Sequence, residues 1–268
     1  MTISAKVIAD SIADGCPRIT TLQLRYPRFI HAEYMTHRVF SRNASSSRAI
    51  PVERMIQDVI DDPAMPVHWG KNQPGMQALE ELEGLDKQEA NMIWLLGRDQ
   101  AVSQARNMAS LGAHKQIVNR ILEPFQHINV LVTATEWDNF FALRDHVDAQ
   151  PEIAELARKM KHAMVMSDPD VLEVGEWHLP YTYKPNLKSV DKLKKISAAR
   201  CASVSYKTVD GKDMDVTKAL AIYEKLAGGD PIHASPFEHI ARPDPSNGSG
   251  CRNFTRWHQW RADIEDAT

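Results

Sequence analysis

The sequence has few cysteines and no long apolar run. Its three cysteines, Cys16, Cys201 and Cys251, lack the short spacings of a metal site, and an odd number is a poor disulfide framework. A reducing cytoplasm is therefore the expected location. No segment approaches the roughly 18 apolar residues of a membrane span, and the N-terminal segment lacks the basic head and apolar run of a secretory signal. We expect a soluble, unprocessed protein without a membrane partner.

The sequence also lacks an excess of basic residues. Lys and Arg number 32 against 35 acidic residues, which gives a net charge of −3 and no broad positive field for binding a phosphate backbone. Nucleic acid is therefore not expected as the main partner. Hydrophobic residues make up 43% of the chain, enough to bury a sizeable core. We predict one compact unit over residues 1–268.

Apolar periodicity predicts strands near the N-terminus and mainly helices in the middle. Residues 19–40 are rich in β-branched and aromatic side chains, which predicts a strand, a break at Pro27, and then a second strand or a short helix. Another strand is predicted at 128–134. Helices are predicted at 52–60, 77–110 (as one interrupted helix or two consecutive helices), 112–122, 136–146 (with Thr135 as N-cap), 151–166 and 215–229. We expect residues 175–188 to form a connection and residues 230–254 to form a long loop that contains a strand.

The most unusual segment is the polar stretch THRVFSRNASSSRAI, from Thr36 to Ile50. It holds three arginines, one histidine and five hydroxyl side chains, and we expect a loop. A polar loop tied at both ends to core elements can hold an anion, because hydroxyl and guanidinium groups bond phosphate oxygens. A flexible serine loop, a phosphorylation target and an RNA-contacting segment are the alternatives.

Arg144 extends an aromatic stripe on the helix predicted after Thr135. Trp137, Phe140, Phe141 and Arg144 follow helical spacing and share one face. One interpretation is that Arg144 pairs with a nearby acid or reaches solvent from the end of the stripe. The other is that it binds an anionic or polarisable ligand, since an unpaired buried guanidinium is costly.

Two further segments carry polar residues in groups. GAHKQIVNRILEP places His114, Lys115 and Arg120 on one helix, and a solvated face is the simpler interpretation. HASPFEH, at 233–239, gathers Ser235 and Glu238 with two histidines around a proline turn. Its spacing does not match that of a zinc-binding helix, so no metal site is predicted.

Together these segments resemble the flavin-dependent thymidylate synthases. The family signature, Arg-His-Arg followed by Ser, Asn, Ser and Arg, is matched by residues 36–38 and then by Ser41, Asn43, Ser46 and Arg48. NFFALRDHVDAQPEI, at 139–153, resembles the segment that carries the substrate arginine of the family, at Arg144. VNRILEP resembles the block with another nucleotide-binding arginine, here Arg120.

Two more blocks resemble the family but stand in a different order. SAARCASVSY at 197–206 and HASPFEH at 233–239 resemble segments that precede the signature in the family and follow it here. The chain therefore resembles a circularly permuted, phage-type member, which implies a bacterial or infected-host cytoplasm. The resemblance implies a single catalytic domain. Its signature and substrate helix lie within residues 1–170, and residues 190–268 resemble the usual N-terminal segment of the family.

The resemblance implies an α+β fold, with a central, mostly antiparallel sheet flanked by helices, in a homotetramer with shared sites. It implies reductive methylation of dUMP to dTMP, with methylenetetrahydrofolate as carbon donor, NADPH as reductant and FAD as hydride carrier. The residues implied at FAD are His37, Arg38, Asn139, Ser205, Ser235 and Glu238. Those implied at dUMP are Ser46, Arg48, Arg120 and Arg144, with Arg144 also stabilising charge at the uracil carbonyl.

The signature is matched incompletely. Thr36 stands at its first arginine, Ala44 at a usual acid, Ala49 at a usual aromatic residue and Glu33 at a usual glutamine. Such positions lie near nucleotide or folate in the family, so a related reaction such as hydroxymethylation of dUMP stays open. So do a transferase with a cysteine nucleophile and a non-enzymatic nucleotide-binding module.

Overall fold

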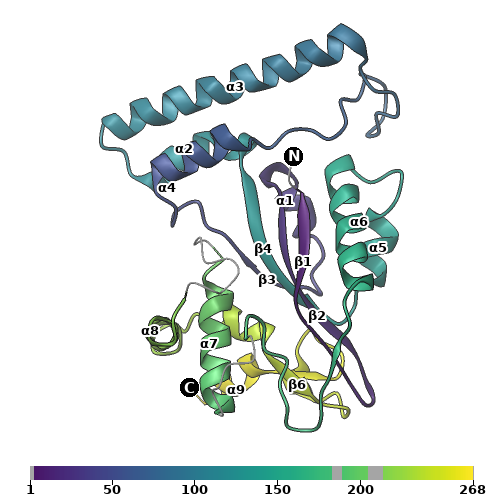
Figure 1. The fold of residues 1–268 in the computed structure, drawn as a ribbon, viewed down its shortest axis with the longest axis vertical. Coiled ribbons are helices and arrows are strands. Elements are labelled where there is room, and N and C mark those ends of the chain that lie inside the picture. The colour runs from purple at the N-terminus through teal and green to yellow at the C-terminus, as the bar shows by residue number, and fades with distance from the viewer. Residues whose placement is uncertain (1–2, 183–188, 205–213, 268) are drawn as a thin grey trace.

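A five-stranded sheet lies at the centre of the computed structural model, which describes residues 3–182, 189–204 and 214–267 (Figure 1). Its strand order is β3-β4-β2-β1-β5, and every pair is antiparallel except β1 with β5. The strands are β1 (Ser4–Ala13), β2 (Cys16–Pro27), β3 (Ser41–Ala44), β4 (His127–Ala134) and β5 (Asp170–Val171). The α+β fold with a mostly antiparallel sheet is confirmed.

The strand β1 was not predicted, because its sequence SAKVIADSIA has no clear apolar alternation. Most of its residues are half-buried, since it lies near the edge of the sheet. It forms a hairpin with β2 around Gly15, whose φ of +67° favours glycine. The predicted break at Pro27 is confirmed, and a short helix follows it, formed by η1 (Arg28–Ile30) and α1 (His31–Tyr34).

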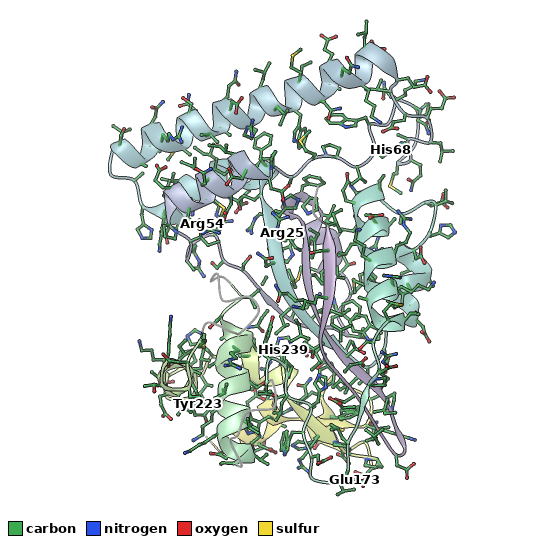
Figure 2. The ribbon with its side chains drawn as sticks, in the orientation of Figure 1. Arg25, Arg54, His68, Glu173, Tyr223 and His239 are labelled. Carbon is green, nitrogen blue, oxygen red and sulfur yellow. The ribbon has the colours of Figure 1, made fainter. Side chains whose placement is uncertain are left out.

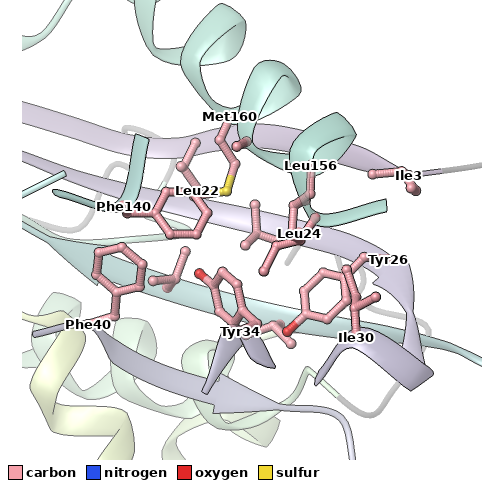
Figure 3. Packing of buried hydrophobic residues seen from close by; sticks show 14 of the residues in the cluster. Ile3, Leu22, Leu24, Tyr26, Ile30, Tyr34, Phe40, Phe140, Leu156 and Met160 are labelled. Carbon is pink, nitrogen blue, oxygen red and sulfur yellow. The ribbon is translucent and has the colours of Figure 1, made fainter. Parts of the chain in front are cut away.

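Two helices cover one face of the sheet and bury the main core. They are α5 (Asp138–Arg144) and α6 (Pro151–Val165), and α6 packs on β1 and β2. The core joins Leu22 and Leu24 of β2 to Leu156 and Met160 of α6, with Tyr34 and the aromatic residues of α5 beside them (Figure 3). Apolar positions three and four residues apart on α6 bring these side chains to the sheet.

A second group of helices lies beyond one end of the sheet, across the top of Figure 1. It contains α2 (Val52–Asp61), α3 (Gly84–Ser110), α4 (Lys115–Ile121) and the turn η2 (Glu123–Phe125). The prediction of a helix from residue 77 was wrong by about two turns, since α3 begins at Gly84. Residues before it pair with an extended segment instead, where Leu82 N donates to Trp69 O at 2.7 Å.

The C-terminal part forms its own cluster and packs against the β3 edge of the sheet. It contains α7 (Val190–Ala202), α8 (Val216–Ala227), η3 (Ser235–His239), β6 (Ala241–Pro243), η4 (Ser249–Cys251), β7 (Trp257–Gln259) and α9 (Trp260–Asp266). Strands β6 and β7 form a separate antiparallel pair. Phe237 of η3 and Trp260 of α9 pack in its core, with ring centroids 5.3 Å apart. His239 lies where this part meets the sheet (Figure 2).

Two local predictions were wrong. The polar stretch 36–50 is not all loop, because Ser41–Ala44 pair with β4 as β3. Thr135 does not cap α5: the N-cap position is Trp137, without a side-chain cap. The Thr135 hydroxyl instead accepts a hydrogen bond from Thr255 N at 3.0 Å, which ties the C-terminal part to this turn. No helix in the described part of the chain is long and apolar enough to cross a bilayer.

Candidate active site

The last residue of α5, Arg144, contacts the beginning of the polar stretch. Arg144 Nε donates to His37 Nε2 at 2.9 Å, across a sequence separation of 107 residues. Its Nη1 forms an ion pair with Glu33, and its Nη2 lies 3.4 Å from the Thr36 hydroxyl. The interpretation that Arg144 pairs with a nearby acid is confirmed, and the interpretation that it binds a ligand stays a prediction.

The His37 ring is held in a defined protonation state. Only 7% of His37 is exposed, and Phe140 packs edge-on against the ring at a centroid distance of 4.9 Å. Burial, and then the charges of Arg144 and Arg42, lower the pKa of His37. Because Nε2 accepts from Arg144, the proton of the neutral ring is assigned to Nδ1. His37 can therefore donate from Nδ1 while Arg144 fixes its orientation.

The bond between Arg144 and His37 joins two cavities. Arg144 and Glu33 line a cavity of about 920 Å³ between α5, α6 and the segment around His68. His37 and Asn139 line a second cavity of about 510 Å³, whose other lining residues include three aromatic side chains, Trp137, Phe140 and Phe141, and three charged ones, Arg18, Glu136 and Asp138. Trp137 forms part of that wall, and its buried indole nitrogen Nε1 has no partner among the described residues.

The remaining residues implied at dUMP lie at the other end of the polar stretch. Helix α4 holds this end, because Asn119 Nδ2 donates to Ser47 O at 2.7 Å and to Ile50 O at 3.0 Å. Arg48 is exposed and Ser46 half-buried. Arg120 is also exposed and pairs with Glu123 at 2.9 Å. The described contacts do not join this group directly to Arg144.

Only two of the described residues implied at FAD line the same cavity. His37 and Asn139 share the 510 Å³ cavity, whereas Arg38 is exposed. Ser235 and Glu238 lie on η3, which packs against β3, and Glu238 is paired with Arg261 of α9. Ser205 lies outside the described residues.

A chain of buried polar groups connects η3 to the sheet, and the sequence analysis did not find it. His239 Nδ1 lies 2.8 Å from the Thr133 hydroxyl, which lies 2.6 Å from that of Thr21. Thr21 is 2.8 Å from His178 Nε2, and His178 Nδ1 is 2.9 Å from Ser11 Oγ. Threonines within the apolar runs of β2 and β4 were the available signal, because a buried hydroxyl needs a partner.

At the other end of this chain, His239 Nε2 lies 3.1 Å from the Asn43 side chain. The orientation of the Asn43 amide that satisfies its neighbours points nitrogen at His239 Nε2 and at the carbonyls of Arg42 and Ser235. Asn43, one of the signature residues, is therefore held by η3. Burial lowers the pKa of His178 to about 4 and that of His239 to about 3, so both rings are neutral near pH 7.

Cysteine and metal chemistry find little support in the described residues. Cys201 and Cys251 are buried, and burial raises the pKa of Cys251 to about 11 and that of Cys201 still further. Such thiols stay protonated and are poor nucleophiles. Within residues 3–182, 189–204 and 214–267, His, Cys, Asp and Glu side chains form no group of three that could hold a metal ion.

Comparison with known proteins places this arrangement in a family. Residues 19–170 match the family model described as Thymidylate synthase complementing protein. The chain belongs to this family. The matched part of the chain contains His37, Arg120, Asn139 and Arg144, whereas η3 lies beyond it. A comparison with curated proteins finds no match.

Two solved structures are similar to this chain in fold. The chain is similar to a UMP/dUMP methylase PolB from Streptomyces cacaoi bound with 5-Br dUMP, with a TM-score of 0.52 and 16% identity, over 60% of this chain and 89% of that chain. The same methylase bound with 5-Br UMP gives a TM-score of 0.52 and 17% identity, over 60% of this chain and 88% of that chain.

Proposed function

We propose that this protein transfers a one-carbon unit to C5 of dUMP and forms dTMP, using FAD, NADPH and methylenetetrahydrofolate. The observation that carries the proposal is the hydrogen bond from Arg144 Nε to His37 Nε2. It joins the arginine implied at dUMP to the histidine implied at FAD, so the two ligands would meet between the two cavities. The family match supports this class of reaction.

The His37 side of this bond suits a flavin. Three aromatic side chains line part of the cavity, and its volume of about 510 Å³ lies within the range of cofactor pockets. The unpartnered N–H of Trp137 would be satisfied by an acceptor atom of a ligand. His37 and Asn139 would hold FAD here, with Arg38, Ser235 and Glu238 as further contacts. When bound, the flavin supplies the hydride that completes the methyl group.

On the other side, the protein's own contribution is electrostatic. The guanidinium of Arg144, placed at a uracil carbonyl, would stabilise negative charge as C5 becomes nucleophilic. Ser46, Arg48 and Arg120 suit the phosphate, because hydroxyl and guanidinium groups donate strong hydrogen bonds to its oxygens. No protein nucleophile is needed, in agreement with the protonated, buried thiols of Cys201 and Cys251.

Hydroxymethylation of dUMP is the related outcome, in which water instead of hydride captures the C5 methylene group. The choice depends on how well the site excludes water. His37 is 7% exposed and Phe140 is 2% exposed. Within this proposal, methyl formation is the expected outcome. The proposal also includes a homotetramer, as in the family that the signature resembles.

Titration with FAD tests the proposal. We expect saturable binding with a shift in the visible absorption spectrum, and weaker binding by His37→Ala. His162→Ala is the control, because His162 is an exposed histidine near the end of α6. If the protein binds no FAD at any concentration that supports oligomers, the flavin assignment is wrong.

A further inference from the structure

The large cavity presents a carboxylate and a guanidinium side by side. Glu33 and Arg144 both line the cavity of about 920 Å³ and form an ion pair whose side chains are 32% and 18% exposed, respectively. Arg144 has five N–H groups. One bonds Glu33, one His37 and one Thr36, which leaves two for a ligand.

Glu33 also keeps one oxygen for a ligand. Its Oε1 accepts from Arg144, and Oε2 has no hydrogen-bond donor among the described residues. An ionised carboxylate can only accept hydrogen bonds, whereas the guanidinium can only donate them. The pair therefore offers one acceptor next to two donors, and it matches a ligand edge with one donor next to two acceptors.

Cytosine has such an edge. Its N4 amino group donates, and its N3 and O2 accept. Uracil presents a different order, with N3–H between the two acceptors O4 and O2. A carboxylate can accept from uracil N3–H but cannot donate to O4, so one uracil oxygen faces the Glu33 side without a donor. Carboxylates accept from the cytosine N4 amino group in the same way in nucleic-acid recognition.

We infer that the pair of Glu33 and Arg144 makes this cavity a binding site for cytosine nucleotides, with dCMP bound at least as tightly as dUMP. The inference rests on the proposed function, because it takes the cavity as a pyrimidine nucleotide site. Glu33 is then a specificity-determining residue. A glutamine in its place would keep an oxygen for Arg144 and offer an N–H to the ligand, which suits O4 of uracil.

The test measures binding of dCMP and dUMP to the full-length protein with FAD present, by calorimetry. Glu33→Gln is compared with Asp145→Asn, which also turns a carboxylate into an amide. Asp145 is adjacent to Arg144 but pairs with Lys161 at 3.1 Å and does not line the cavity. We expect Glu33→Gln to raise the ratio of the dissociation constants, dCMP over dUMP, by about tenfold or more. Asp145→Asn should leave the ratio unchanged.

Three results would overturn the inference. The wild type binds dUMP more tightly than dCMP, or Glu33→Gln leaves the ratio within twofold, or Asp145→Asn shifts it as far as Glu33→Gln does. In each case dUMP still binds and the proposed function stands. If neither nucleotide binds to the protein with FAD present, the proposed function fails and the inference fails with it.

Discussion

The contacts of Arg144 show how one side chain links several parts of the candidate site. Its position in the last turn of α5 is favourable, because a cation there faces the negative end of the helix dipole. All three of its polar partners come from the segment between residues 33 and 37, at the end of α1 and just after it. Two of them, Glu33 and Thr36, are departures from the family signature.

Arg144→Ala is expected to fold and to lose turnover of the nucleotide. Removing an electrostatic donor of this kind typically costs about 3 to 4 kcal/mol of transition-state stabilisation, or roughly 10² to 10³ in kcat. Steady-state kinetics would measure the loss, with Arg54→Ala as control, since Arg54 is a half-exposed arginine paired with Asp58 on α2. Full turnover by Arg144→Ala would show that the arginine is only structural.

Replacing Cys16, Cys201 and Cys251 together by alanine should leave turnover per folded molecule largely intact. Burial raises the pKa of all three thiols, so none is a ready nucleophile at neutral pH. Turnover is measured at saturating substrate and normalised to folded protein by circular dichroism. A single cysteine whose removal abolishes turnover, while folding and FAD binding persist, would favour a cysteine nucleophile instead.

The hydrogen bonds of the buried polar chain between η3 and the sheet all run in one consistent direction. Asn43 donates to His239 Nε2, so His239 donates from Nδ1 to Thr133. Thr133 then donates to Thr21, and Thr21 donates to His178 Nε2. His178 Nδ1 in turn donates to Ser11. This order needs both histidines neutral, because a protonated His178 would point a second N–H at the donating Thr21 hydroxyl, and a protonated His239 would point one at the donating Asn43 amide.

The two neutral, buried histidines of this hydrogen-bonded chain, His178 and His239, predict a loss of protein stability as the pH falls from 7 to 5. The pKa of His178 is lowered to about 4 and that of His239 to about 3. The unfolded histidines take up protons below about pH 6.5 and the folded ones do not, so the stability present above pH 6.5 is lost towards acid. Each histidine contributes a loss of about 2 kcal/mol between pH 7 and 5.

The measurement is urea unfolding at both pH values. The pKa values of His31, His37 and His127 are lowered as well, so the wild type should lose more than this. His178→Gln isolates one contribution: it should be less stable at pH 7, but its loss between pH 7 and 5 should be smaller by about 2 kcal/mol. An unchanged pH dependence in this variant would show that His178 does not resist protonation.

The sequence predicted those elements whose apolar pattern is strong. Helices α2, α4 and α6 and the strand β4 lie where periodicity placed them, within a few residues. It missed β1, whose half-buried residues have mixed polarity, and it placed the start of α3 too early. The neighbours of Arg144 could be suspected only from the resemblance. The ion pair with Glu33 and the chain through His178 depend on tertiary packing, which periodicity does not encode.

The C-terminal part of the chain, from α7 to α9, contacts the signature segment of the N-terminal part. Asn253 Nδ2 donates to Val39 O at 2.8 Å, and Gln259 Nε2 lies 3.3 Å from Ser41 Oγ. With the contact between Asn43 and His239, these bonds place the C-terminal part against the polar stretch. Residues of the C-terminal part that are about 200 positions away in the sequence therefore hold the signature segment in place.

The exposed apolar side chains of the long helix α3 indicate that the protein forms an oligomer. Only Val102 and Ala105 of this helix are buried, whereas Leu85, Met92, Ile93 and Leu96 are 55% to 79% exposed. Large exposed apolar patches usually mark an interface. We expect a tetramer by light scattering, and smaller species for the double substitution Met92→Lys and Leu96→Lys. Val174→Lys, at a 91% exposed site outside α3, is the control. A monomeric wild type would contradict the prediction.

The most direct test of the proposed function is mass spectrometry of the nucleotide formed by the purified protein. The reaction contains dUMP, methylenetetrahydrofolate, NADPH and FAD, and Arg144→Ala serves as the inactive reference. We expect a product heavier than dUMP by one CH2 group, formed only when FAD and NADPH are both present. A hydroxymethyl product, or no conversion of dUMP by protein that is folded and loaded with flavin, would contradict it.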